Sequence, residues 1–148
     1  MSFRTQLFRK VTIVGVGLIG GSIGMAIKKY NLAREVVGYS QRNASLMSAL
    51  KNHAVDHTSL DLKKAVYNAD LVILSTPVST IINILTTIGP FLKHNCIITD
   101  VGSTKTTIFQ AAEKSLSNPS FFVGSHPLTG SEKTGSSFAD PNLFENAL

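Results

Sequence analysis

Short apolar runs alternate along this chain with segments in which apolar residues recur at the spacing of an α-helical turn. Short runs of this kind are typical of buried strands, and the longer period is typical of amphipathic helices. The runs predict strands at 11–14, 35–40, 70–75, 95–101 and 120–125, with a further short strand at 54–57. The periodic segments predict helices after Gly20 and at 43–52, 60–69, 79–92 and 104–116.

This alternation predicts an α/β fold: a Rossmann-like, doubly wound, mostly parallel sheet with helices on both faces. The length of 148 residues fits one domain over 1–148. Because such sheets bind ligands beyond the carboxyl ends of their strands, five segments are selected for chemistry. They are 15–20, 40–42, 75–78, 100–105 and 124–132. The closing stretch LFENAL is expected to lead into one more strand.

The first of these segments places Gly15, Gly17 and Gly20 in the spacing G-x-G-x-x-G, between a strand and a helix. In that context the first glycine allows a tight turn, the second lets a diphosphate approach the backbone, and the third lets the helix pack on the strand. The N–H groups around Leu18 and Ile19 would then face the diphosphate at the positive end of the helix. A glycine-rich turn without a ligand and a secretory signal are the alternatives, although no cleavage site follows.

The end of the second predicted strand indicates which dinucleotide binds. An NAD-binding domain usually carries Asp or Glu there, on the ribose 2′-hydroxyl. Here Ser40, Gln41 and Arg42 occupy that position, and no carboxylate occurs between residues 36 and 55. Ser40 can donate a hydrogen bond to a 2′-phosphate, and Arg42 can add paired donors and a plane that stacks on adenine. The pattern favours NADP, with NAD as the alternative if Arg42 is an ordinary solvated side chain.

Two further strand ends carry polar residues. Ser75, Thr76 and Pro77 are expected to line the ribose of the nicotinamide, although they also fit a helix-start signal before the next helix. In DVGSTK, Gly102 is a candidate cofactor contact, and Ser103 can N-cap the helix that follows.

The last motif, GSHPLTGSEKTG, places His126 at a predicted strand end on the ligand side. A histidine beside a nucleotide-binding motif favours acid–base chemistry over a structural role.

Together the motifs VGVGLIGGSIG, STPV, DVGSTK and GSHPLTGSEKTG resemble the prephenate and arogenate dehydrogenases of tyrosine biosynthesis, over nearly the whole chain. YSQR resembles the NADP-using members. The resemblance implies an NADP-dependent oxidative decarboxylation of prephenate to 4-hydroxyphenylpyruvate, with arogenate as the alternative substrate. It implies that His126 accepts the proton of the substrate hydroxyl. It also implies that the Ser103 hydroxyl hydrogen-bonds the histidine and the substrate hydroxyl. It places Ser131 and Glu132 near the substrate side chain.

The same resemblance implies a helical domain that follows this one, dimerises the enzyme and supplies cations for a dicarboxylate substrate. No part of this chain matches that domain. We therefore expect a homodimer only when it is present, and poor turnover of prephenate by this chain alone. Lys105 and Lys133 are the candidate cations here. Two other functions stay open: a non-catalytic NADP-binding module, and an NADP dehydrogenase of the β-hydroxyacid type.

Composition narrows the remaining classes. Hydrophobic residues make up 43% and charged residues 16% of the chain, as in a globular domain, and the net charge of +5 is spread without a basic stripe. The sequence contains no nucleic-acid-binding motif and no continuous membrane-spanning run, so neither partner is expected. The single cysteine, Cys96, lies in an apolar run, which fits a buried thiol in a reducing cytoplasm. We assign no metal site.

Overall fold

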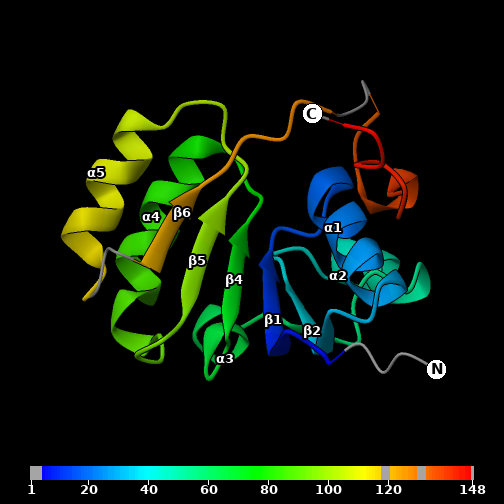
Figure 1. The fold of residues 1–148 in the computed structure, drawn as a ribbon, viewed down its shortest axis with the longest axis horizontal. Coiled ribbons are helices and arrows are strands. Elements are labelled where there is room, and N and C mark those ends of the chain that lie inside the picture. Colours follow the sequence, from blue (N-terminus) through cyan, green and yellow to red (C-terminus); the bar gives the residue numbers. More distant parts are fainter. Residues whose placement is uncertain (1–4, 118–120, 130–132, 148) are drawn as a thin grey trace.

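The computed structural model describes residues 5–117, 121–129 and 133–147, and its strands form one sheet in which every pair of neighbours is parallel. The strand order is β3-β2-β1-β4-β5-β6 (Figure 1). The strands are β1 (Phe8–Val14), β2 (Ala33–Tyr39), β3 (His57–Ser59), β4 (Leu71–Leu74), β5 (Ile97–Asp100) and β6 (Phe122–Gly124). This order confirms the predicted Rossmann-like sheet, and the described strands are parallel throughout. The winding direction reverses between β1 and β4, where such folds bind ligands.

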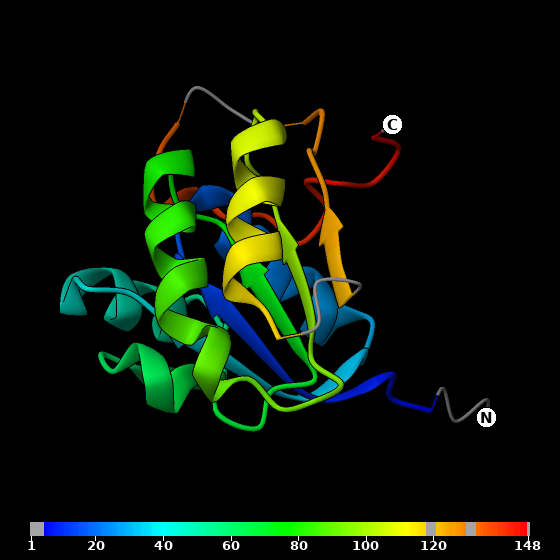
Figure 2. The ribbon, with the colours of Figure 1, turned by 90° about the vertical axis from the view of Figure 1, so that its left-hand side faces the viewer.

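Helices cover the sheet on both faces, as the alternation predicts. On one face lie α1 (Leu18–Lys29) and α2 (Asn43–Lys51); on the other lie α3 (Leu62–Val66), α4 (Val78–Ile88) and α5 (Thr106–Ser115). Figure 2 shows α4 and α5 side by side in front of the sheet, with α1 behind it. Two 3₁₀ turns complete the described elements, η1 (Gly89–Phe91) and η3 (Ser136–Phe138). None of the described helices combines the length and the apolar character needed to cross a membrane.

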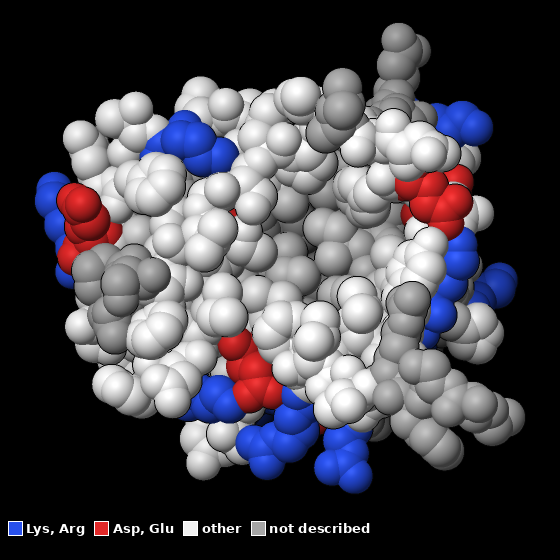
Figure 3. All heavy atoms as spheres, in the orientation of Figure 1, with Lys and Arg blue, Asp and Glu red and all other residues white. Residues whose placement is uncertain are grey.

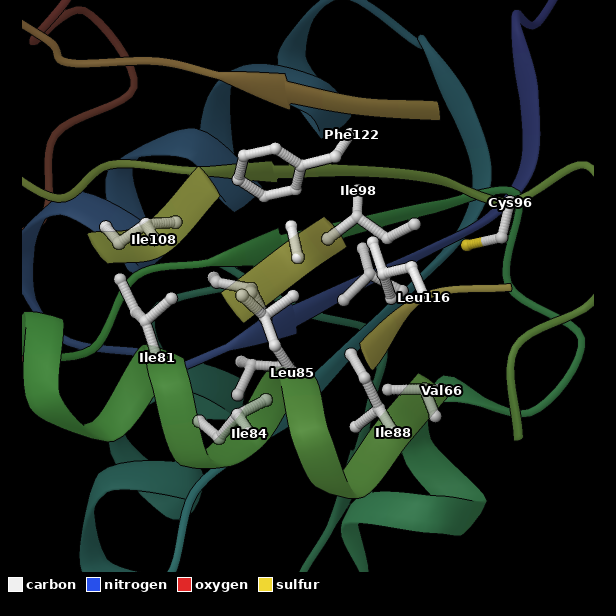
Figure 4. Close-up of a cluster of buried hydrophobic side chains, with 14 of the residues drawn as sticks. Val66, Ile81, Ile84, Leu85, Ile88, Cys96, Ile98, Ile108, Leu116 and Phe122 are labelled. Atoms are coloured by element: carbon white, nitrogen blue, oxygen red, sulfur yellow. The ribbon is translucent and has the colours of Figure 1, made fainter. Parts of the chain in front are cut away.

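The two faces of the sheet carry two hydrophobic cores, because successive strand residues point to opposite sides. Val14 and Leu74 pack with α3, α4 and α5, whereas Ile13 and Ile73 pack with α1 and α2. Figure 4 shows the first core, where the periodic residues of α4 point at those of β5 and α5. Each fully buried aliphatic side chain stabilises the fold by about 1.5–3 kcal/mol. Thr12, the polar residue of β1, is fully buried and donates to the carbonyl of Ala65 at 2.6 Å.

All six strands end in one aligned row. Parallel pairing sets the last residues of neighbouring strands opposite one another: Ser59, Tyr39, Val14, Leu74, Asp100 and Gly124. The segments that follow these residues therefore emerge along a single edge of the sheet. Since neighbouring strands lie about 4.8 Å apart, the glycine turn after β1 and the loop after β6 start about 14 Å from each other on that edge.

Two elements differ from the prediction for local reasons. The strand expected at 54–57 begins instead at His57, because Ala54 and Val55 are buried against α1 and α2 before pairing starts. The helix expected at 79–92 ends at Ile88 and continues as η1, because Pro90 has no N–H to donate to the helix.

The segment 133–147, called the strap below, contains η3 and a series of turns. Its last part, including LFENAL up to residue 147, folds into turns that lie against α1. The Asp140 N–H donates to the buried Ser22 hydroxyl at 2.9 Å, and Glu145 pairs with Lys29 at 2.6 Å. These contacts place the strap against α1, and the expectation that LFENAL leads into a further strand stays a prediction.

Candidate functional site

The glycine turn has the geometry that its spacing predicts. Gly15 adopts φ +97°, a left-handed conformation that side chains rarely allow, and α1 begins three residues later at Leu18. A Cβ on Gly20 would lie 2.0 Å from the carbonyl oxygen of Gly15, so only glycine lets the helix sit this close to the turn. At Gly17 a Cβ would meet nothing within 4 Å. The backbone is therefore open to a ligand on that side.

The turn after β4 supports the glycine turn. The Ser75 hydroxyl donates to the carbonyl of Gly15 at 2.7 Å, and α4 begins directly after Pro77. The Thr76 hydroxyl is buried and has no hydrogen-bond partner among the described residues. A buried polar atom without a partner is costly, and a bound ligand that reached it would remove that cost.

Ser40, Gln41 and Arg42 line a cleft of about 730 Å³ beside the glycine turn, called the Arg42 cleft. Its lining residues are Gly15, Tyr39, Ser40, Gln41, Arg42, Leu62, Thr76, Pro77, Thr80, Asn83, Ile84 and Thr87. Arg42 is the only charged residue in this set. The Ser40 oxygen accepts from the Arg42 N–H at 3.1 Å, which leaves the hydroxyl proton available to a ligand. Thr76 and Pro77 thus line the Arg42 cleft, and their predicted contact with the ribose of the nicotinamide stays a prediction.

A second opening, called the glycine crevice, has a volume of about 360 Å³. It is lined by Gly17, Leu18, Ile19, Ser75, Val101, Lys133, Thr134 and Gly135. The predicted contacts Leu18 and Ile19 therefore meet Ser75 here, together with the beginning of the strap. The Arg42 cleft and the glycine crevice lie on the two sides of the glycine turn.

Asp100, at the end of β5, hydrogen-bonds both the segment that follows β5 and the segment that follows β6. Its side chain is fully buried and accepts from the Gly102 N–H at 2.8 Å, from the Ser125 N–H at 3.4 Å and from the Lys105 ammonium. Gly102 is buried with its N–H committed to this carboxylate. Lys105 is an ion-pair partner of Asp100, which argues against the role of substrate cation expected from the sequence.

Ser103 and His126 are both exposed, in the segments that Asp100 holds. The alternative role of Ser103 as a helix N-cap was wrong: α5 begins at Thr106 with Lys105 at the N-cap position, because the turn held by Asp100 delays the helix. Ser103 follows β5 and His126 follows β6, so both lie at the sheet edge that carries the glycine turn.

The neighbours of His126 line an apolar hollow of about 200 Å³, called the Pro127 hollow. Its lining residues are Ile23, Ile73, Thr99, Asp100, Val101, Ser125, Pro127 and Phe144. Figure 3 shows the face of the molecule that is seen in Figure 1. This face is hollowed near its centre, and most of its Lys, Arg, Asp and Glu side chains lie around the border. Val101 lines both this hollow and the glycine crevice. Three openings thus follow one another along the carboxyl edge, from Arg42 to His126.

Comparison with known proteins identifies the family. The model of the prephenate dehydrogenase nucleotide-binding domain matches residues 23–148. A prephenate dehydrogenase of Lactococcus lactis is 41% identical over 141 residues, which cover 94% of this chain and 39% of that protein. The chain belongs to the prephenate dehydrogenase family.

Solved structures agree with this family. The crystal structure of Aquifex aeolicus prephenate dehydrogenase in complex with hydroxyphenyl propionate and NAD⁺ superposes with a TM-score of 0.85 at 29% identity, over 99% of this chain and 50% of that one. Synechocystis arogenate dehydrogenase gives a TM-score of 0.84 at 33% identity, over 93% of this chain and 48% of that one. The chain thus spans about half the length of these relatives or less.

Two predicted substrate residues of the family motif, Ser131 and Glu132, lie outside the described residues. Asp100 was missed as a site residue, although a carboxylate that closes the apolar run CIITD was a usable signal. No group of three or more His, Cys, Asp or Glu side chains in the described part of the chain is placed to hold a metal ion.

Proposed function

We propose that this chain is the NADP-binding domain, over residues 1–148, of a prephenate dehydrogenase that carries out oxidative decarboxylation to 4-hydroxyphenylpyruvate. The observation that carries the proposal is the aligned row of strand ends. It sets the open backbone at Gly17 and the loop of His126 on one sheet edge, with the glycine crevice and the Pro127 hollow between them. Membership of the family supports the reaction class.

The residues present fit a nicotinamide dinucleotide. The N-cap of α1, Gly17, brings no side-chain cap, so the first N–H groups of the helix are available to a diphosphate. The Thr76 hydroxyl lies buried beside the Arg42 cleft without a partner. None of the described residues that line this cleft carries a carboxylate, and Arg42 together with the free proton of Ser40 suits a 2′-phosphate. These features favour NADP, although the A. aeolicus relative was crystallised with NAD⁺.

The chemistry that NADP supplies when bound is the acceptance of a hydride from the carbon that bears the substrate hydroxyl, with loss of carbon dioxide from the opposite ring carbon. The neutral imidazole of His126 accepts the hydroxyl proton, and the Ser103 hydroxyl hydrogen-bonds the imidazole and the substrate. The apolar Pro127 hollow accommodates the ring. Lys105 is paired with Asp100, so we propose that cations of the helical domain implied by the family resemblance bind the two substrate carboxylates, and that this domain also forms the dimer.

Arogenate is the second candidate substrate, favoured by the likeness to Synechocystis arogenate dehydrogenase. Arogenate carries an amino group where prephenate carries a keto group, and Ser131 and Glu132 are the residues of this chain proposed to lie nearest that side chain.

Titration with NADP⁺ and NAD⁺ side by side tests the cofactor assignment. In Arg42→Gln, the loss of charge-assisted hydrogen bonds worth about 1.5–3 kcal/mol weakens NADP⁺ about 10-fold to 100-fold and leaves NAD⁺ within about 2-fold. Arg34→Gln is the matched control, since Arg34 is exposed near the opposite end of β2. Equal weakening of both dinucleotides by Arg42→Gln would contradict the 2′-phosphate site.

The catalytic assignment is tested by prephenate-dependent reduction of NADP⁺. We expect this chain alone to bind NADP⁺ and to turn over prephenate poorly or not at all, and turnover at a rate of about 10 s⁻¹, the median for enzymes, would overturn that expectation. In a protein that also carries the substrate-binding domain, His126→Asn lowers kcat about 100-fold or more with cofactor affinity unchanged. An unchanged kcat would favour a non-catalytic NADP-binding module.

A further inference from the structure

The beginning of the strap forms one wall of the glycine crevice. Lys133, Thr134 and Gly135 line this opening opposite Gly17 and Leu18, at the start of α1. The sequence motif that ends in these residues suggested contacts with the substrate. In the fold, the three residues lie beside the turn proposed to hold the diphosphate, whereas Ser125 and Pro127, which flank His126, line the Pro127 hollow.

The strap is anchored immediately after these residues. Ser136 is buried, and its carbonyl accepts from the Asn52 side chain at 2.9 Å. A Cβ on Gly21 would lie 3.0 Å from the Cβ of Ala139, so α1 and the strap are in close contact. Gly135 adopts φ +93°, which turns the chain into η3. These contacts hold residues 133–135 next to the first turn of α1.

The charge of the crevice suits an anion. Among the described residues that line it, Lys133 alone carries a charge, and the first turn of α1 contains no acidic residue. The Lys133 ammonium lies 5.1 Å from the centre of the Phe138 ring, which belongs to η3 and therefore to the anchored part of the strap. The positive end of α1 and the residue Lys133 thus belong to two walls of one opening.

We propose that the strap is part of the dinucleotide site and that Lys133 binds the cofactor diphosphate rather than a substrate carboxylate. The inference rests on the proposed function, because it assigns a second wall to the same cofactor site. Lys133 supplies a positive charge to the diphosphate from the side opposite the α1 N–H groups. Because NAD⁺ and NADP⁺ share the diphosphate, its contribution is the same for both, unlike that of Arg42.

Calorimetric titration of this chain with NADP⁺, NAD⁺, ADP-ribose and AMP tests the proposal. ADP-ribose contains the diphosphate without nicotinamide, and AMP lacks the diphosphate. In Lys133→Gln, NADP⁺, NAD⁺ and ADP-ribose each bind about 5-fold to 10-fold more weakly, as expected for loss of one charge-assisted contact, and AMP is unchanged. Lys133→Arg keeps the charge and restores affinity to within about 2-fold. Added salt weakens the wild type more steeply than Lys133→Gln.

Lys51→Gln is the control, because Lys51 is exposed at the end of α2 and its loss changes the net charge equally. Unchanged binding of ADP-ribose by Lys133→Gln overturns the inference, and so does an equal loss in Lys51→Gln. If the wild-type chain binds none of the dinucleotides, the proposed function fails instead. The thermal midpoint of each variant without ligand shows whether it remains folded.

Discussion

The buried ion pair between Asp100 and Lys105 gives the sharpest test of what stabilises the loops after β5 and β6, which carry Ser103 and His126. Asp100 is fully buried, whereas the Lys105 side chain keeps 29% of its exposure. Lys105→Met removes the counter-ion and leaves a carboxylate in the protein interior with the N–H groups of Gly102 and Ser125 as its remaining partners. The variant keeps the apolar stem of the side chain, so the change isolates the charge.

The expected loss of stability follows from that burial. Breaking a buried pair by removing one partner costs about 3–5 kcal/mol, and the partial exposure of Lys105 lets water screen the remaining charge. We therefore expect a loss of about 2–3 kcal/mol, against a total of about 5–15 kcal/mol for a domain. Asp100→Asn is also destabilising, because an amide presents only one oxygen where the carboxylate presents two. The double variant costs less than the sum by about 1–2 kcal/mol, since the two side chains are coupled.

Urea unfolding followed by circular dichroism measures these losses. With an m value of about 2 kcal/mol per M, Lys105→Met lowers the midpoint by about 1–1.5 M. Lys114→Met, an exposed lysine of the same helix, is the control and shifts it by about 0.3 M or less. A loss below about 0.5 kcal/mol in Lys105→Met, or strict additivity in the double variant, would refute the reasoning, because Asp100 would then be hydrated in the folded state.

Two further predictions concern titratable groups away from the site. Burial raises the pKa of Asp70, but hydrogen bonds from Lys93 and from the N–H groups of Arg9 and Lys10 outweigh it and hold the pKa below its ordinary value. A depressed pKa contributes stability above the unfolded pKa that is lost as pH falls through the folded one, so Asp70→Asn destabilises at pH 7 and has little effect near pH 2 in urea unfolding. Cys96 is 2% exposed and burial raises the pKa of its thiol to about 11, so an aromatic disulfide reagent at pH 8 reacts with it only when the structure opens, and rapid labelling of the folded chain would contradict this.

Local pattern was sufficient to predict most of the fold. Apolar runs and helical spacing indicated the strands and helices, because each element must bury one face or both. The spacing of apolar residues within a single segment shows which face is buried. The glycine spacing likewise predicted a sharp turn at Gly15 and close packing at Gly20, since both are steric properties of a short segment. The order of strand and helix then favoured a parallel sheet, whose carboxyl edge selected the segments to examine.

Contacts between distant residues were beyond the reach of the sequence. Lys105 was a plausible substrate cation until the structure showed its pairing with Asp100, and the sequence of the strap did not show that Asp140 and Glu145 contact α1. Hydrophobic periodicity carries no record of such pairings, because a polar side chain exposed in an isolated segment can be buried or bonded once another element reaches it. The sequence by itself determined the elements, the glycine turn and the family motifs. Only the tertiary structure decided which polar groups form hydrogen bonds and ion pairs with one another at the carboxyl edge of the sheet, and which face the openings along that edge.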